Sequence, residues 1–201
     1  MTNYKQERQI KWHPPEPRRG LAGYWDKFVG PGAKRAELWI QFVPVVLAGL
    51  AVPLYSSIKG LGWTVPQFII ATLLTMDMVG GAITNATNTA KRWYHREGQG
   101  FQQHFLFIAI HATQLFLVAW FFCGSHWWSF FGILYGYLLV TAFVILSVPL
   151  YLQRPVAILC YVGSILINCY VIAPIPGLEW FVPVFFLKLL ISHLLEEAPF
   201  V

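Results

Sequence analysis

The sequence predicts an all-α, polytopic membrane protein built around a bundle of six transmembrane helices. Six long apolar stretches fill most of the chain, and each is about as long as the roughly 20 residues that a helix needs to cross about 30 Å of hydrocarbon. The composition agrees, because 11% of the residues are charged and 57% are hydrophobic, whereas a soluble domain has about 25% charged residues. The stretches are 38–56, 65–84, 104–122, 129–150, 155–172 and 180–197.

The distribution of basic residues predicts the orientation of these spans. The chain has 14 Lys and Arg and a net charge of +5. All of them lie before the first span, between spans two and three or between spans four and five, except Lys59 on the opposite side and Lys188 inside a span. Because cytoplasmic loops carry an excess of Lys and Arg, both termini are expected in the cytoplasm (N-in/C-in). The charge therefore indicates topology and not a nucleic-acid partner, and the expected location is a bacterial inner (cytoplasmic) membrane.

Two parts are expected along the chain, a basic cytoplasmic arm over 1–37 and a six-helix transmembrane domain over 38–201. Within the arm, apolar residues recur at spacings of three and four, which on a helix would form one apolar face. This pattern predicts an interfacial helix lying on the inner leaflet. A disordered basic tail is the alternative, because glycines at positions 20, 23 and 30 disfavour a helix interior. The apolar residues of the arm are Leu21, Tyr24, Trp25, Phe28 and Val29.

The longest connection between spans covers residues 85–103, on the predicted cytoplasmic side. The other connections are short, which makes sequence neighbours antiparallel neighbours in the bundle. The long connection concentrates amide, imidazole and cationic side chains that could hold an anionic head group. The alternative is that its Lys and Arg only determine topology. The residues predicted to bind substrate are Asn85, Asn88, Lys91, Arg92 and His95.

Three ionisable side chains from three spans are predicted to share one layer of the bundle. Counting about 1.5 Å per residue from the cytoplasmic boundary places Asp77, His111 and His193 each about 12 Å deep. Ionisable groups inside a bilayer are costly unless they are partnered, so each is a candidate functional residue. The long stem of Lys188 could reach toward Asp77. These four residues are the predicted catalytic residues, and the alternative is that Asp77 and Lys188 form only a structural ion pair.

The same region contains side-chain types that bind zinc or non-haem iron. Two histidines and a carboxylate can hold such a metal and leave positions open for water or oxygen. The chain has no HxxxH pair, so the ligands would have to meet through tertiary contacts. Histidines inside a bundle also commonly hydrogen-bond across helices, which is the alternative. The predicted metal ligands are Asp77, His104, His111, His193 and Glu196, with Glu197 as a substitute for Glu196.

These features predict a membrane-embedded enzyme that acts on a lipid or other hydrophobic small molecule at the cytoplasmic leaflet. Acidic and basic side chains that cluster on one side of the membrane favour an enzyme over a transporter, which would need polar groups along a path across the bundle. A small transporter or its substrate-binding subunit, which would use Asp77 and Lys188, is one alternative. A cytochrome b-like carrier with haem between His111 and His193 is another. A structural subunit that docks through the arm is the third, and the sequence is compatible with a homo- or hetero-oligomer.

Overall fold

The computed structural model describes residues 13–197, and within this part of the chain every regular element is a helix. The element η2 is a π-helix, and η1 is a short 3₁₀ turn. The elements are α1 (Leu21–Val29), α2 (Arg35–Lys59), α3 (Val65–Ala86), α4 (Asn88–Tyr94), α5 (Phe101–Ile110), α6 (Ala112–Phe122), η1 (Gly124–His126), α7 (Trp127–Ser147), α8 (Leu150–Tyr170), α9 (Phe181–Phe186) and η2 (Leu187–His193).

Five helical segments are long and apolar enough to cross a membrane, as expected of a membrane protein. They are α2, α3, the pair α5–α6, α7 with the preceding η1, and α8, and they coincide with the first five predicted spans. The sixth predicted span is different, because the apolar helix there runs only over Phe181–His193. At 1.5 Å per residue this helix is about 20 Å long, which is short of the roughly 30 Å hydrocarbon core. The predicted number of six spans is therefore not confirmed.

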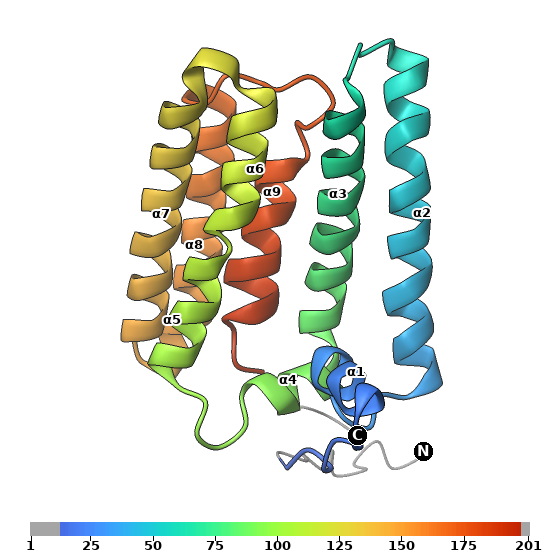
Figure 1. Cartoon of the computed structure of the whole chain (residues 1–201). Helices are drawn as coiled ribbons and strands as arrows, with labels where there is room; N and C mark the ends of the chain where they lie inside the picture. The colour runs from blue at the N-terminus through green and yellow to red at the C-terminus, as the bar shows by residue number, and fades with distance from the viewer. Residues whose placement is uncertain (1–12, 198–201) are drawn as a thin grey trace, which may run out of the picture.

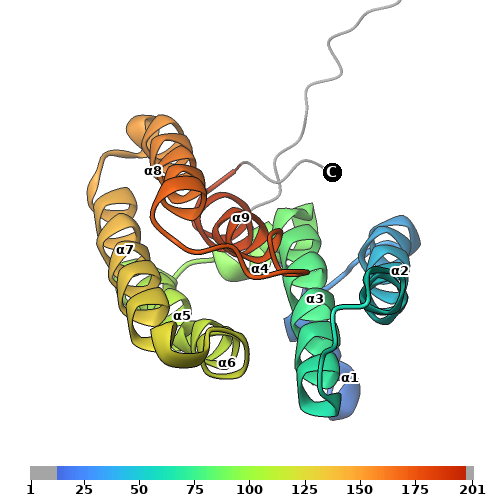
Figure 2. The ribbon, with the colours of Figure 1, turned by 90° about the horizontal axis from the view of Figure 1, so that it is seen from above.

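The α9–η2 helix lies at the centre of the bundle. Figure 1 shows α2 and α3 side by side at one edge, and Figure 2 shows α5–α6, α7 and α8 in an arc with α9 between the arc and α3. A helix that is apolar all round is typically buried. The residues Phe181, Phe185, Phe186, Leu189 and Leu190 are each at most 1% exposed. This short helix therefore lies in the hydrophobic core and packs against α3 and α8.

The hairpin between α2 and α3 is fixed by helix-end chemistry. Gly60 ends α2 with φ +60°, a left-handed conformation that glycine adopts without strain. The backbone N–H of Thr64 donates to the Gln67 side chain at 2.8 Å, and Pro66 occupies the first turn of α3. These signals set where α3 begins, and thus the position of every polar residue along it.

The predicted helix in the N-terminal arm is confirmed as α1, although the first 12 residues of the arm lie outside the described part of the chain. Gly20 and Gly30 are located at its two ends, so only one of the three glycines interrupts the helix. The side chains of Leu21, Tyr24 and Phe28 are 88%, 73% and 57% exposed. An apolar surface of this kind suits a helix that lies in the membrane interface.

The long connection between the second and third spans contains a further helix, α4, which packs against α1. The N-cap hydroxyl of Thr87 accepts a hydrogen bond from the backbone of Ala90 at 3.3 Å. A Cβ at Gly30 would overlap the backbone of Thr89 and Ala90, so glycine permits the close approach of the two segments. Tyr94 donates to the Phe28 carbonyl at 3.2 Å. The end of the bundle where α1 and α4 lie (Figure 1) is called the α4 end below.

Candidate functional site

Polar side chains meet along the contact between α3 and the α9–η2 helix. On α3, Asp77, Gly81 and Asn85 repeat every four residues and share one face. Lys188 and His193 are five residues apart, and in an α-helix they would point about 140° away from each other. Because a π-helix bonds residue i to residue i+5, these two residues instead lie about one turn apart on the same face of η2. The π-helix thus presents two polar side chains to the polar face of α3.

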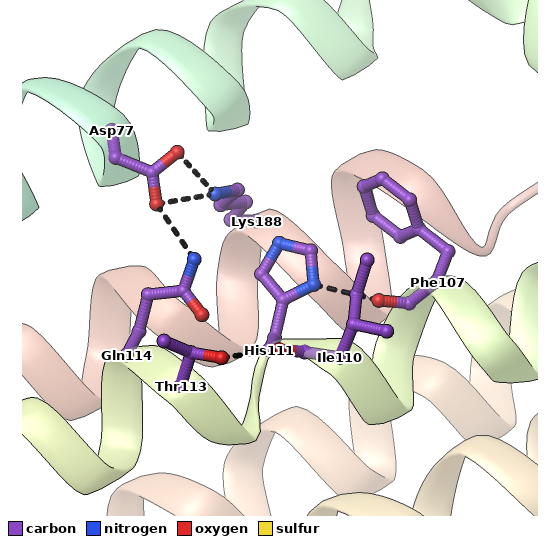
Figure 3. A network of polar contacts seen from close by, with 7 residues as sticks. All are labelled: Asp77, Phe107, Ile110, His111, Thr113, Gln114 and Lys188. Atoms are coloured by element: carbon purple, nitrogen blue, oxygen red, sulfur yellow. Dashed lines mark hydrogen bonds and ion pairs between the residues drawn. The ribbon is translucent and has the colours of Figure 1, made fainter.

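The first group, called the ion-pair layer, contains Asp77, Lys188, Gln114 and His111 (Figure 3). The Lys188 ammonium donates to both carboxylate oxygens of Asp77 at 2.9 Å, and Gln114 Nε2 donates to Asp77 Oδ2 at 3.3 Å. A Cβ at Gly81 would overlap the stem of Lys188, so glycine leaves the space in which that stem lies. The ion pair that the sequence suggested is therefore present, and it joins α3 to η2.

His111 interrupts the third span and separates α5 from α6. In an uninterrupted α-helix its backbone N–H would donate to the Phe107 carbonyl. Instead, His111 Nδ1 donates to that carbonyl at 2.7 Å, and the backbone N–H bonds to the Ile108 carbonyl at 3.1 Å. The side chain has replaced the backbone as the donor. Figure 3 shows the imidazole held in this way beside the Asp77–Lys188 pair.

The second group, called the histidine layer, contains Asn85, His193 and His104. His193 Nδ1 lies 3.3 Å from Asn85 Oδ1, and His193 Nε2 lies 3.2 Å from His104 Nδ1. A carbonyl oxygen only accepts, so His193 carries its proton on Nδ1 and its Nε2 accepts from His104 Nδ1–H. His104 Nε2 is then left as an unprotonated nitrogen. With the Asn85 amide in this orientation, the hydrogen-bond chain from Asn85 through His193 ends at the unprotonated Nε2 of His104.

The histidine layer is buried and held by a stacked aromatic ring. The exposed fractions of His104 and His193 are 6% and 2%. The Phe107 ring stacks on His193 with ring centroids 3.8 Å apart. Such packing fixes the imidazole orientation on which the hydrogen-bond chain depends.

Lys91 on α4 and His95 just after it cover the histidine layer at the α4 end. His95 Nε2 donates to the His193 carbonyl at 2.9 Å, and its ring stacks on His104 with centroids 4.5 Å apart. Burial lowers the pKa of His95 to about 3, with further lowering by the charges of His104 and Lys91. Lys91 Nζ donates to the carbonyls of Ser192 and Leu195 at 2.6 and 2.5 Å. Burial lowers the pKa of Lys91 to about 8, against the opposing effect of the Glu197 carboxylate.

A polar cavity of about 300 Å³, called the α4 cavity, lies beside the histidine layer. Its lining includes His104 and His95, together with the Arg96 guanidinium and the Glu196 carboxylate. His104 Nδ1 is used by the histidine layer, so Nε2 is the nitrogen that remains for a molecule in the cavity. The α4 cavity is therefore lined by an imidazole (His104), a guanidinium (Arg96) and a carboxylate (Glu196).

The predicted metal site is not supported. Asp77 and His111 lie in the ion-pair layer, His104 and His193 lie in the histidine layer, and Glu196 lies beside the α4 cavity. The carboxylate is neutralised by an ammonium group, and the two histidines of the histidine layer bond to each other. Across residues 13–197, no three His, Cys, Asp or Glu side chains are placed to hold a metal ion. Within the described part of the chain, the predicted zinc or iron site is therefore unsupported.

The residues predicted to bind substrate are divided among different surroundings. Of the five, only His95 lines the α4 cavity. Asn85 belongs to the histidine layer, and Lys91 bonds to the end of η2. Asn88 is exposed and Arg92 is half-buried, and neither lines the α4 cavity.

One polar residue close to Asp77 was missed in the sequence. Gln41 is 3% exposed, on α2, and accepts a hydrogen bond from Thr84 at 2.8 Å. A signal was available, because a carboxamide stands there among apolar residues of the first span. Because its side chain is uncharged, it is not among the ionisable groups that mark candidate functional residues inside a bilayer.

Comparisons with protein-family models, with curated proteins and with solved structures gave no match. The geometry of the two layers and of the α4 cavity is therefore the basis for a functional interpretation.

Proposed function

We propose that this protein is a membrane-embedded enzyme that uses general acid–base catalysis on a lipid or other hydrophobic substrate. The observation that carries the proposal is the hydrogen-bond chain from Asn85 through His193 to His104, which ends at the α4 cavity. A buried polar network in which every member is oriented is a costly arrangement in an otherwise apolar bundle. Residues arranged in this way are suited to hold and move a proton.

In this proposal the α4 end faces the cytoplasm. The helices α1 and α4 lie at that end (Figure 1), and they carry Lys27, Lys91 and Arg92, which agrees with the excess of Lys and Arg on the cytoplasmic side of membrane proteins. The exposed apolar residues of α1 would lie in the same leaflet. A substrate would therefore approach from the inner leaflet, with its polar group in the α4 cavity and its apolar part in the membrane.

His104 is the proposed catalytic base. Its Nε2 takes a proton from a substrate hydroxyl or from an attacking water molecule. The positive charge that forms is stabilised because Nδ1–H donates to His193, whose own Nδ1–H donates to the Asn85 carbonyl. His193 and Asn85 are positioning residues, since they fix the tautomer and do not line the α4 cavity.

Arg96 is the proposed anchor for an anionic part of the substrate. It lines the α4 cavity, and its guanidinium lies 3.7 Å from the centroid of the Trp93 ring. This stacking holds the planar group in place, and a guanidinium can bind a phosphate or carboxylate through two parallel hydrogen bonds. The ion-pair layer fixes η2 against α3 and so holds His193 in register with Asn85.

A transporter is the second candidate, and the position of Asp77 favours it. The Asp77 side chain is 44% exposed although the residue lies in the middle of α3. A carboxylate in such a place can bind a proton or a cation during transport. Both nitrogens of His193 are already hydrogen-bonded, so no observation favours haem between His111 and His193.

The enzyme proposal is tested in proteoliposomes prepared with the total lipid extract of the producing cells. Lipids are analysed by mass spectrometry after incubation, and we expect a lipid product that forms with the wild-type protein. The H104Q variant should form it at least about 100-fold more slowly, since positioned bases contribute about 10²–10⁴-fold. An N85D variant keeps the acceptor and should shift the pH profile of the rate upward, because a carboxylate stabilises the imidazolium better than an amide does.

H126Q is the matched control, because His126 is an exposed histidine outside both layers. Its rate should equal that of the wild-type protein. A product that forms equally fast with H104Q, or the absence of any product with the wild-type protein, would exclude the enzyme. Proton flux into the same vesicles that disappears in a D77N variant would favour the transporter.

A further inference from the structure

A second cavity lies on a different part of α3, between α1, α2 and α3. Its volume is about 140 Å³, and it does not share a lining residue with the α4 cavity. An apolar cavity of about 150 Å³ is large enough to hold benzene. Asp77 forms part of its lining, and the side chain of Asp77 is 44% exposed.

Gln41 gives this cavity an unsatisfied polar group. Its carboxamide oxygen accepts from the Thr84 hydroxyl at 2.8 Å. Its Nε2 is buried, and among residues 13–197 it has no hydrogen-bond partner. Leaving a buried polar group unpaired destabilises the folded state. If the amide were turned around, the oxygen would be the unpaired end, so in either orientation one polar atom in the lining needs a partner.

The remaining walls of the cavity are mainly aromatic and aliphatic. Trp25 stacks on Phe42 with ring centroids 5.2 Å apart, and both residues line the cavity. Gly80 lies on the α3 wall, where an added Cβ would overlap the Val45 side chain, so glycine permits the close approach of α2 and α3. Flat aromatic walls favour a flat ring as the occupant.

The position of α1 indicates the route of access. Trp25 belongs to α1, whose residues Leu21 and Tyr24 are strongly exposed. In the membrane these side chains would contact lipid at the interface, and Trp25 and Phe28 of the same helix line the cavity. A molecule dissolved in the membrane can therefore reach the cavity without crossing water.

We infer that this cavity binds the ring of a lipid-soluble phenol. A hydroxyl group both donates and accepts hydrogen bonds, so it can satisfy the free end of Gln41 in either orientation of the amide. The Asp77 carboxylate provides a second acceptor in the same cavity. A quinone carbonyl only accepts, so it could pair with a free Nε2 but not with a free oxygen, and a plain hydrocarbon ring would leave Gln41 unpaired. The inference is independent of the proposed enzyme, because it uses neither the histidine layer nor the α4 cavity.

The test uses 4-butylphenol and butylbenzene as probes, which differ by one hydroxyl group. Binding to the wild-type protein in lipid nanodiscs is measured by saturation-transfer NMR, with empty nanodiscs giving the partitioning background. We expect saturable binding of 4-butylphenol and about fivefold weaker binding of butylbenzene, the ratio that one neutral hydrogen bond provides. A Gln41→Leu variant should bind 4-butylphenol about fivefold more weakly than the wild-type protein does, with a smaller preference over butylbenzene.

Gln102→Leu is the matched control, because Gln102 is an exposed glutamine at the start of α5. It should retain the preference for the phenol. Equal binding of the two probes to the wild-type protein, no saturable binding of either, or an unchanged preference in Gln41→Leu would each overturn the inference. The comparison of probes on the wild-type protein decides the matter even if Gln41→Leu does not fold.

Discussion

The ammonium of Lys188 lies 2.9 Å from both carboxylate oxygens of Asp77, but the two partners have different surroundings. The Lys188 side chain is 4% exposed, whereas that of Asp77 is 44% exposed. Asp77 also keeps a hydrogen bond from Gln114 that does not depend on the lysine. Loss of the carboxylate therefore strands a charge in the core, whereas loss of the lysine leaves a carboxylate that keeps the hydrogen bond from Gln114.

This asymmetry predicts unequal effects of two substitutions. D77N should lower the free energy of unfolding by about 3 kcal/mol, because it leaves a buried ammonium without its counterion. K188M should cost only about 1 kcal/mol, and the double variant D77N/K188M should be more stable than D77N alone. Thermal unfolding midpoints and SDS-induced unfolding in detergent micelles measure these differences. Equal and additive effects of the single variants would contradict the asymmetry.

Gly81 is predicted to be intolerant of a single added methyl group. A Cβ there would overlap the stem of Lys188, so G81A must displace the lysine from Asp77. The expected loss of stability is about 1–3 kcal/mol. The matched control is G136A in the interior of α7, where no atom lies within 4 Å of the added Cβ. That variant should be neutral or stabilised by up to about 1 kcal/mol, because alanine favours a helix more than glycine does. Equal unfolding midpoints of the two variants would show that Gly81 has no special packing role.

The helices themselves could be predicted from the sequence because each depends on local signals. Long apolar stretches defined α2, α3, α5–α6, α7 and α8, and apolar spacing defined α1. The sixth span was overestimated because hydropathy does not report where a helix stops. The apolar segment continues through Leu194 and Leu195, but the helix ends at His193. The two leucines are buried outside a helix instead.

The sequence predicted that Asp77, His111 and His193 share one layer, and the structure brings only two of the three together. His111 does lie beside Asp77 in the ion-pair layer (Figure 3). His193 instead bonds to Asn85, which is eight residues or about 12 Å further along α3. The depth estimate assumed a regular helix through residue 197. The π-helix and its early end cannot be recognised from one sequence, because both result from packing against α3 and α8.

The His95 side chain predicts a loss of stability in mild acid. Burial lowers the pKa of His95 to about 3 in the folded protein, against about 6.5 in an unfolded chain. Between these values the unfolded chain binds more protons, so stability falls as the pH falls from about 6.5 toward about 3. His95 should account for about 1.5 kcal/mol of the loss between about pH 6.5 and about pH 5. Thermal unfolding of H95Q across this range should show a shallower decline than the wild-type protein, whereas H126Q should follow the wild-type curve. Parallel curves for wild-type and H95Q would mean that His95 is not shielded from protonation.

Lys91 is predicted to hold the end of η2 in place. Its ammonium donates to the carbonyls of Ser192 and Leu195, which lie at or just beyond the C-terminal end of η2 and would otherwise lack a donor. K91M keeps the length of the side chain and removes the donor, so it should cost about 2 kcal/mol. Hydrogen exchange followed by mass spectrometry should show faster exchange confined to peptides that cover 190–197. The control is K59M, because Lys59 is an exposed lysine at the opposite end of the bundle. Unchanged exchange in K91M would show that packing alone orders this segment.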